Sequence, residues 1–246
     1  MKLASAENSL AQLKLKILIW NILRGASNRV PEVISALLRH NADSIFFSEY
    51  RNNADGDVVS AALEEAGYRY VYSPKTARPN DNTVLLASKL SFVSKNRSAR
   101  FGEHTSRFVV AEFDTFNFIG LHINNKSNPA YSYLSGLPQK FVLGKTIIAG
   151  DFNTGINYLD GEGYRFSRGA KFGALLANGW TDAWRTMHPL GNEFSWYSQK
   201  NNGFRIDHIL LSTGLRGCLE KAEFSHVERE TGTSDHSILA VELKPQ

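Results

Sequence analysis

The feature that most constrains this fold is segment 145–153, Lys-Thr-Ile-Ile-Ala-Gly-Asp-Phe-Asn, where an apolar run ends in a glycine, an acid and an amide. β-Branched apolar residues bounded by glycine predict a strand inside a sheet. Asp151 and Asn153 are two positions apart, so their side chains are expected on one face at the strand end. Such a pair can hold an attacking water and a phosphate oxygen, although Asp and Asn also mark purely structural turns.

Polar residues recur where other predicted strands begin or end. Charged groups inside a sheet cost free energy unless they are paired or bound to a metal. A single site that gathers these side chains explains all of them together. The residues are Asn21, Glu49, His122, Asp207 and the pair Asp235-His236.

Segment 30–40 has a proline near its start and apolar residues at helical spacing, which predicts an amphipathic helix between strands 15–21 and 43–49. A strand-helix-strand crossover brings both strand ends to the same edge of a sheet. Asn21 and Glu49 are therefore expected side by side. An amide oxygen beside a carboxylate suits Mg²⁺ or Mn²⁺.

With its motifs in this order, the chain resembles the endonuclease/exonuclease/phosphatase superfamily. This group includes exonuclease III, apurinic/apyrimidinic endonucleases, deoxyribonuclease I, inositol polyphosphate phosphatases and neutral sphingomyelinases. The resemblance implies an α/β (α+β) fold, a four-layer αββα sandwich of two packed mixed, largely antiparallel sheets flanked by helices. The matching motifs are Trp20-Asn21, Ser48-Glu49, Gly150–Asn153, Arg205–His208 and Ser234–His236.

The resemblance also implies roles for the matching residues. Glu49 would be the main ligand of Mg²⁺ or Mn²⁺, with Asn21 beside it and Asp235 near it. Asp151 would align or deprotonate the attacking water, and Asp207 would orient His236. The phosphoryl oxygens would be held by Asn153, His122 and His236. A histidine at position 122 resembles deoxyribonuclease I and the phosphatase branches, whereas apurinic endonucleases usually have tyrosine there.

The flanking segments resemble the exonuclease III branch, in which an apolar pocket receives a sugar that lacks its base. Trp196, Phe204 and Ile206 are the candidates for such a pocket, with core packing as the alternative. Asn125 matches an asparagine that supports the phosphate in the apurinic branch. Arg168, at a predicted helix start, is a candidate anion contact, or part of a plain loop. Some nucleases of the family carry an acid where this chain has Leu23, so a second metal position built on that acid is not expected.

Charge and composition agree with a polyanionic substrate. The chain has 28 Lys+Arg against 24 Asp+Glu, and if several acids converge on one site, the remaining surface is more basic than the net +4 suggests. An ordinary solvated basic surface is the alternative. The run Lys95, Arg97, Arg100 and Arg107, which holds Phe101 and His104, is a candidate nucleic-acid contact, with a merely solvated surface as the alternative.

With 246 residues, 42% of them hydrophobic, the chain can bury a large core without disulfides. Its one cysteine suits a reducing compartment, so a cytoplasmic protein is expected. No stretch is long and apolar enough to cross a membrane. Residues 1–13 are interpreted as an N-terminal tail and 14–246 as one domain, which we expect to be a monomer.

The sequence therefore predicts a divalent-metal-dependent phosphodiesterase that hydrolyses DNA by in-line attack of an activated water. Endonuclease action, 3′-5′ exonuclease action and action at abasic sites all remain open. An inositol-phosphate phosphatase or sphingomyelinase-like phospholipase is the enzymatic alternative. A catalytically inactive nucleic-acid-binding module is the alternative from another class, and the full complement of catalytic residue types argues against it.

Overall fold

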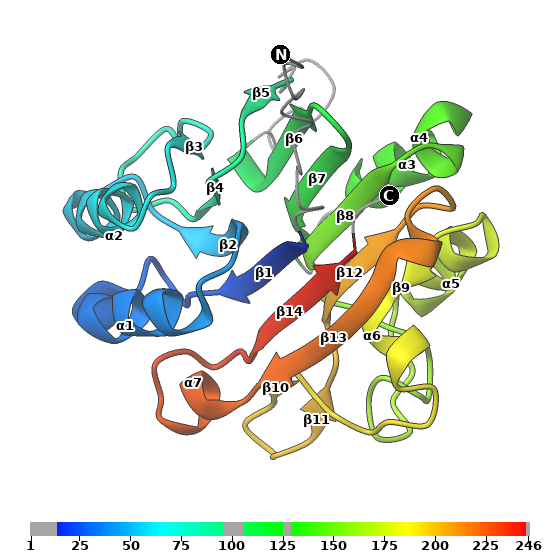
Figure 1. The fold of residues 1–246 in the computed structure, drawn as a ribbon. Coiled ribbons are helices and arrows are strands. Elements are labelled where there is room, and N and C mark those ends of the chain that lie inside the picture. The colour runs from blue at the N-terminus through cyan, green and yellow to red at the C-terminus, as the bar shows by residue number, and fades with distance from the viewer. Residues whose placement is uncertain (1–13, 96–105, 125–128, 245–246) are drawn as a thin grey trace, which may run out of the picture.

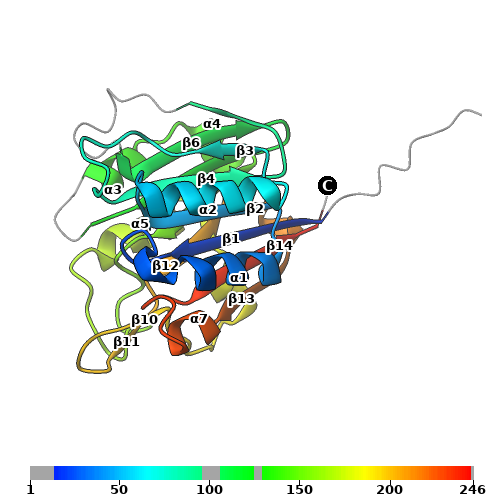
Figure 2. The same cartoon turned by 90° about the vertical axis from the view of Figure 1, so that its left-hand side faces the viewer.

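The computed structural model of the protein describes residues 14–95, 106–124 and 129–244. Within these ranges, two six-stranded sheets pack face to face, and helices cover their outer faces (Figures 1 and 2). This four-layer arrangement confirms the predicted αββα sandwich. Asn125, Arg97, Arg100, Phe101 and His104 lie outside the described residues, as does the predicted tail 1–13.

The first sheet, here the β1 sheet, has the order β13-β14-β1-β2-β4-β3. β1 and β2 run parallel and are joined by α1 (Val30–His40), as predicted, while the other neighbouring strands are antiparallel. The strands are β1 (Leu15–Asn21), β2 (Ser44–Tyr50), β3 (Tyr70–Tyr72), β4 (Thr83–Ser88), β13 (Leu219–Ser225) and β14 (Ile238–Leu243).

The second sheet, here the β8 sheet, has the order β5-β6-β7-β8-β12-β9. β6 and β7 form a hairpin, and β7 runs parallel to β8. Between β4 and β5, the chain passes from the β1 sheet to the β8 sheet. The strands are β5 (Phe92–Ser94), β6 (Phe108–Phe113), β7 (Asn117–His122), β8 (Thr146–Asp151), β9 (Thr181–Asp182) and β12 (Asp207–Leu211); β10 (Trp196–Tyr197) and β11 (Gly203–Phe204) form a separate ribbon.

Helices α1 and α2 pack on the β1 sheet, and α3 and α5 pack on the β8 sheet. The largest apolar cluster lies between the two sheets. The side chain of Asn53 accepts a hydrogen bond from Gly56 N and caps the first turn of α2. The helices are α2 (Ala54–Glu65), α3 (Pro129–Ser135), α4 (Gln139–Leu143), α5 (Gly169–Ala177), α6 (Ala183–Met187) and α7 (Val227–Glu230), with 3₁₀ turns η1 (Ser27–Arg29) and η4 (Arg216–Cys218).

The two sheets pack tightly around Phe46 of β2. Its ring occupies the space that a Cβ atom at Gly120 of β7 would need. Gly150 of β8 has φ of 136°, and a Cβ atom there would overlap the carbonyl oxygen of Leu121 as well as meet Phe46. Glycine is therefore required at the position directly before Asp151.

Among the described helices, none has the length and apolar character needed to cross a bilayer.

Candidate active site

The predicted polar residues meet where strands of both sheets end. The register pairs His122 with Asp151 across parallel β7 and β8, and Asp151 with Asp207 across antiparallel β8 and β12. Asn21 ends β1 and pairs with Ser48, the residue before Glu49. The packing of the two sheets brings these two groups of strand ends together.

A continuous series of short contacts links the gathered side chains. Asn21 Nδ2 donates to Asp151 Oδ2 at 3.1 Å and lies 3.5 Å from His236 Nε2. His122 Nε2 lies 3.7 Å from Asp151 Oδ2 and 4.0 Å from Glu49 Oε1. These side chains therefore lie together in one site, as the sequence pattern predicted.

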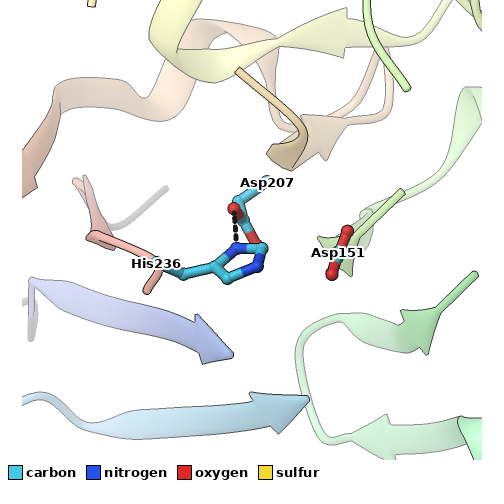
Figure 3. Close-up of side chains that lie close together, drawn as sticks. All are labelled: Asp151, Asp207 and His236. Carbon is cyan, nitrogen blue, oxygen red and sulfur yellow. Dashed lines mark hydrogen bonds and ion pairs between the residues drawn. The ribbon is translucent and has the colours of Figure 1, made fainter. Parts of the chain in front are cut away.

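His236 is paired with a carboxylate. Its Nδ1 lies 2.8 Å from Asp207 Oδ2, and Figure 3 shows the imidazole ring between Asp207 and Asp151. Burial alone would lower the pKa of His236, but the charge and hydrogen bond of Asp207 and the charge of Asp151 outweigh burial and raise it to about 10. The ring is therefore an imidazolium at neutral pH, with a second N–H on Nε2.

His122 has the opposite kind of partner. Arg107, one residue before β6, donates from Nη1 to His122 Nδ1 at 3.0 Å. Burial, followed by the charges of Arg107 and His236, lowers the pKa of His122 to about 3. This ring is therefore neutral across the physiological range.

The loop after β1 holds the two predicted metal ligands in place. Leu23 N donates to Asn21 Oδ1 at 3.0 Å, and Arg24 N donates to Glu49 Oε2 at 2.9 Å. Leu23 and Arg24 have φ of 50° and 54°, and Glu49 itself has φ of 59° at the point where the β2–β4 register shifts. Left-handed backbone at non-glycine residues costs free energy and is concentrated at functional sites.

Asp151 is buried, and its carboxylate lies close to that of Asp207. Its pKa is raised above its usual range by burial and then by the charge of Asp207, against the opposing effects of His236, Asn153 and Asn21. Asn153 N donates to Asp151 Oδ1 at 2.8 Å, and Asn153 Nδ2 donates to the carbonyl of Ile123 at 2.8 Å. A cation next to Asp151 would restore the ionised carboxylate.

The donor atoms present fit a hard divalent cation. Asp151, Asp207 and His236 offer potential ligand atoms that all lie within 4.8 Å of one another. A protonated imidazole cannot ligate a metal, so the carboxylate and amide oxygens are the better donors of this site. Glu49 and Asn21 provide such oxygens on the β1 sheet side.

A cavity of about 590 Å³ opens beside Asn153. It contains the three predicted pocket residues Trp196, Phe204 and Ile206 together with Tyr164 and Phe166, which sequence reasoning missed. The rings of Tyr164, Phe166 and Phe204 are edge to face with centroids 5.2 to 6.0 Å apart, and Trp196 lies 5.7 Å from Phe204. These four rings form an aromatic wall, and the tyrosine and phenylalanine residues of the loop before α5 are the sequence signal that could have indicated it.

Trp196 lies between this cavity and the residues Asp235 and His236. Its Nε1 donates to Asp235 Oδ2 at 3.0 Å, and its ring centroid lies 6.4 Å from that of His236. Asp235 itself is exposed, and its charge contributes to the raised pKa of His236.

A buried ionic network, also missed from the sequence, fixes the aromatic wall. Arg205 is fully buried and donates to Asp160 at 3.0 and 2.9 Å and to Asp182 at 2.8 Å. Asp160 also accepts from Ile156 N at 2.7 Å. The loop that carries Tyr164 and Phe166 is thereby tied to the strand end before Asp207.

Three basic residues were predicted as candidate contacts to an anion or to nucleic acid. Arg168 is half-buried at the start of α5, and its charge lowers the pKa of Tyr131 against the larger raising effect of burial. Its role as a substrate contact stays a prediction. Arg107 contacts His122, while Lys95 pairs with the exposed Glu112 at 3.1 Å.

The sequence model of the Endonuclease/Exonuclease/phosphatase family matches residues 18–236. An exodeoxyribonuclease of Streptococcus pneumoniae serotype 4 is 25% identical over 280 aligned positions, which cover 93% of this chain and 99% of that protein.

Solved structures share the fold. A variant of the 3′ phosphatase NExo from Neisseria, bound to a product DNA hairpin, has a TM-score of 0.76 and 22% identity, covering 94% of this chain and 99% of that one. An AP endonuclease from Archaeoglobus fulgidus has a TM-score of 0.76 and 17% identity, covering 93% of this chain and 99% of that one. The family match, the sandwich of two sheets and the gathered side chains together lead to one conclusion: the chain belongs to the endonuclease/exonuclease/phosphatase family.

Proposed function

We propose that this enzyme hydrolyses phosphodiester bonds of DNA with Mg²⁺ or Mn²⁺, as an endonuclease, a 3′-5′ exonuclease or both, including at abasic sites. The observation that carries the proposal is the placement of Asp151 beside the imidazole rings of His122 and His236, with His122 Nε2 3.7 Å from its carboxylate. Relatives named for action on DNA, namely an exodeoxyribonuclease and an AP endonuclease, support DNA as the substrate class.

Each side chain of the site has a defined task in the proposed reaction. A water attacks phosphorus in line with the departing oxygen, and its proton passes to Asp151 as the new P–O bond forms and the old one breaks. His236 and His122 donate N–H groups to the phosphoryl oxygens, where negative charge develops. The side-chain amide of Asn153 is a further candidate donor.

Glu49 would hold the divalent cation, with Asn21 and Asp235 near it. When bound, the cation supplies positive charge for the leaving oxygen. The chain itself presets Glu49 and Asn21 through the backbone N–H groups of Arg24 and Leu23.

The aromatic cavity favours a nucleic-acid substrate over a free inositol phosphate. Trp196 and Phe204 offer ring faces next to Asn153, and these faces can pack against a deoxyribose or a base. The cavity therefore receives the nucleoside unit next to the cleaved phosphate in the proposed complex.

The test compares substrates with Mg²⁺ and with EDTA: plasmid, an abasic duplex, a duplex with a recessed 3′ end, a 3′-phosphorylated oligonucleotide, inositol phosphates and sphingomyelin. We expect cleavage of DNA with Mg²⁺ and none with EDTA. Asp151→Asn is expected to lower kcat by about 10² or more with the fold intact, because the water loses its proton acceptor. Release of phosphate from inositol phosphates with DNA left uncut would overturn the proposal in favour of a phosphatase.

A further inference from the structure

The pairing of β6 with β7 in the β8 sheet places Arg107 next to His122. The β6–β7 register pairs Phe108 with Leu121, so the next position sets Arg107 opposite His122. Its guanidinium Nη1 lies 3.0 Å from His122 Nδ1. The charges of Glu49 and Asp151 also act on this guanidinium and raise its pKa, against the larger lowering effect of burial. Arg107 is therefore part of the site, whereas the sequence made it a candidate nucleic-acid contact.

The chemistry of this hydrogen bond fixes the tautomer of His122. A guanidinium has donors and no acceptor, so Nδ1 of His122 has to be the acceptor. A neutral imidazole carries a single proton, which must then sit on Nε2. That nitrogen points toward the carboxylates of Asp151 and Glu49, at 3.7 and 4.0 Å.

We propose that Arg107 is a positioning residue that holds His122 as a neutral imidazole with its proton on Nε2, ready to donate to a phosphoryl oxygen. Asp207 does the reverse for His236, whose Nδ1 donates to a carboxylate at 2.8 Å. Nδ1 therefore has opposite hydrogen-bonding roles in the two rings, and each ring keeps an N–H on Nε2. The catalytic part of this inference rests on the proposed function, whereas the tautomer does not.

The tautomer is measured on the wild-type protein without any activity assay. Long-range ¹H–¹⁵N correlation spectra of ¹⁵N-histidine-labelled protein distinguish the two neutral tautomers and the cation, and His122→Ala assigns the signals. We expect a neutral ring protonated on Nε2 at pH 7 for His122 and a doubly protonated ring for His236. A His122 ring protonated on Nδ1, or doubly protonated, would overturn the inference.

Kinetics on DNA then test whether Arg107 acts through His122. Arg107→Met keeps the bulk of the stem but removes the donor, and we expect kcat to fall by about tenfold or more with a smaller change in KM. Arg107→Lys retains a donor and should recover part of this loss. In the His122→Ala background, Arg107→Met should have no further effect on kcat.

The matched control is Arg69→Met, which removes one exposed arginine at the far end of the sheet, since Tyr70 pairs with Ser88 and Ser88 with Ser44. It should leave kcat unchanged. Additive losses from Arg107→Met and His122→Ala would show that Arg107 contacts the substrate directly and would overturn the positioning role. If the wild-type protein cuts no DNA, the proposed function fails, and the spectra still decide the tautomer.

Discussion

Two histidines in one site are set to different charge states by the residue behind each ring. Asp207 accepts from His236, and Arg107 donates to His122. The sequence motifs predicted Asp207 and both histidines, because these positions follow the order of the family motifs. Arg107 carried no such signal, since its meaning depends on a cross-strand partner 15 positions away.

Asp207→Asn tests the charge state of His236. The amide oxygen still accepts a hydrogen bond but brings no charge, so the pKa of His236 should fall from about 10 toward its ordinary value. We expect kcat at pH 8 to fall by about 10², with partial recovery toward pH 6, where the ring regains its proton. A pH–rate profile checks this, with the melting temperature as the control for folding. A variant profile parallel to that of the wild type would contradict the assignment.

Glu228 lies away from the site, and its environment makes the stability of the fold depend on pH. It is nearly fully buried, and it accepts from His40 at 3.1 Å, Ser225 at 2.7 Å and Arg39 at 2.5 Å. Burial alone would raise its pKa, but these hydrogen bonds lower it from 4.5 to about 2. A carboxyl group whose pKa is lower in the folded state stabilises the fold above pH 4.5, and this stabilisation is lost as the pH falls toward 2.

Glu228→Gln should therefore lower the free energy of unfolding by about 2 kcal/mol at pH 6, a figure reduced because its partner Arg39 is half exposed to solvent. The difference from the wild type should shrink steadily below pH 4. Urea denaturation at pH 6, 4 and 3 measures it. A difference that stays constant with pH would mean that the ionised carboxylate contributes nothing.

At the scale of elements, the spacing of apolar residues predicted those helices and strands that depend on nearby residues alone. The β1-α1-β2 crossover and the apolar strand β8 both follow from the periodicity of apolar residues and from the residues that bound them. The left-handed loop after Asn21 and the aromatic wall of Tyr164 and Phe166 did not, because both depend on contacts with distant strands.

The contact between the sheets gives a matched pair of predictions. Gly120→Ala and Gly150→Ala should each destabilise the fold, by about 2 kcal/mol and about 3 kcal/mol or more respectively. Phe46→Leu should relieve much of the cost at Gly120, where the obstacle is the Phe46 ring, and little at Gly150, where it is the Leu121 carbonyl and a positive φ. Double-mutant cycles in urea measure the two couplings. Equal relief at both glycines would contradict this account.

At the scale of the whole molecule, the site belongs to neither sheet alone. Asn21 and Glu49 come from the β1 sheet, whereas His122, Asp151 and Asp207 come from the β8 sheet. The order of motifs along the chain predicted this convergence through family resemblance, but which side chains would touch could only follow from the packing of the sheets.

Loss of activity and loss of structure should therefore coincide. In a urea series, we expect DNA cleavage, tryptophan fluorescence and far-ultraviolet circular dichroism to share one midpoint, because separating the sheets takes the site apart. Activity that disappears at a clearly lower urea concentration, with circular dichroism unchanged, would show that the site opens locally while the sandwich stays closed.

Along the sequence, the first side chain of the candidate site is Asn21 and the last is His236, and β14 returns to lie between β1 and β13. Cutting the polypeptide anywhere between these points would leave two inert pieces, each lacking groups that the other holds. Only their reassociation would recreate a working enzyme, so this scaffold lends itself to a split reporter whose signal announces that two fused partners have met.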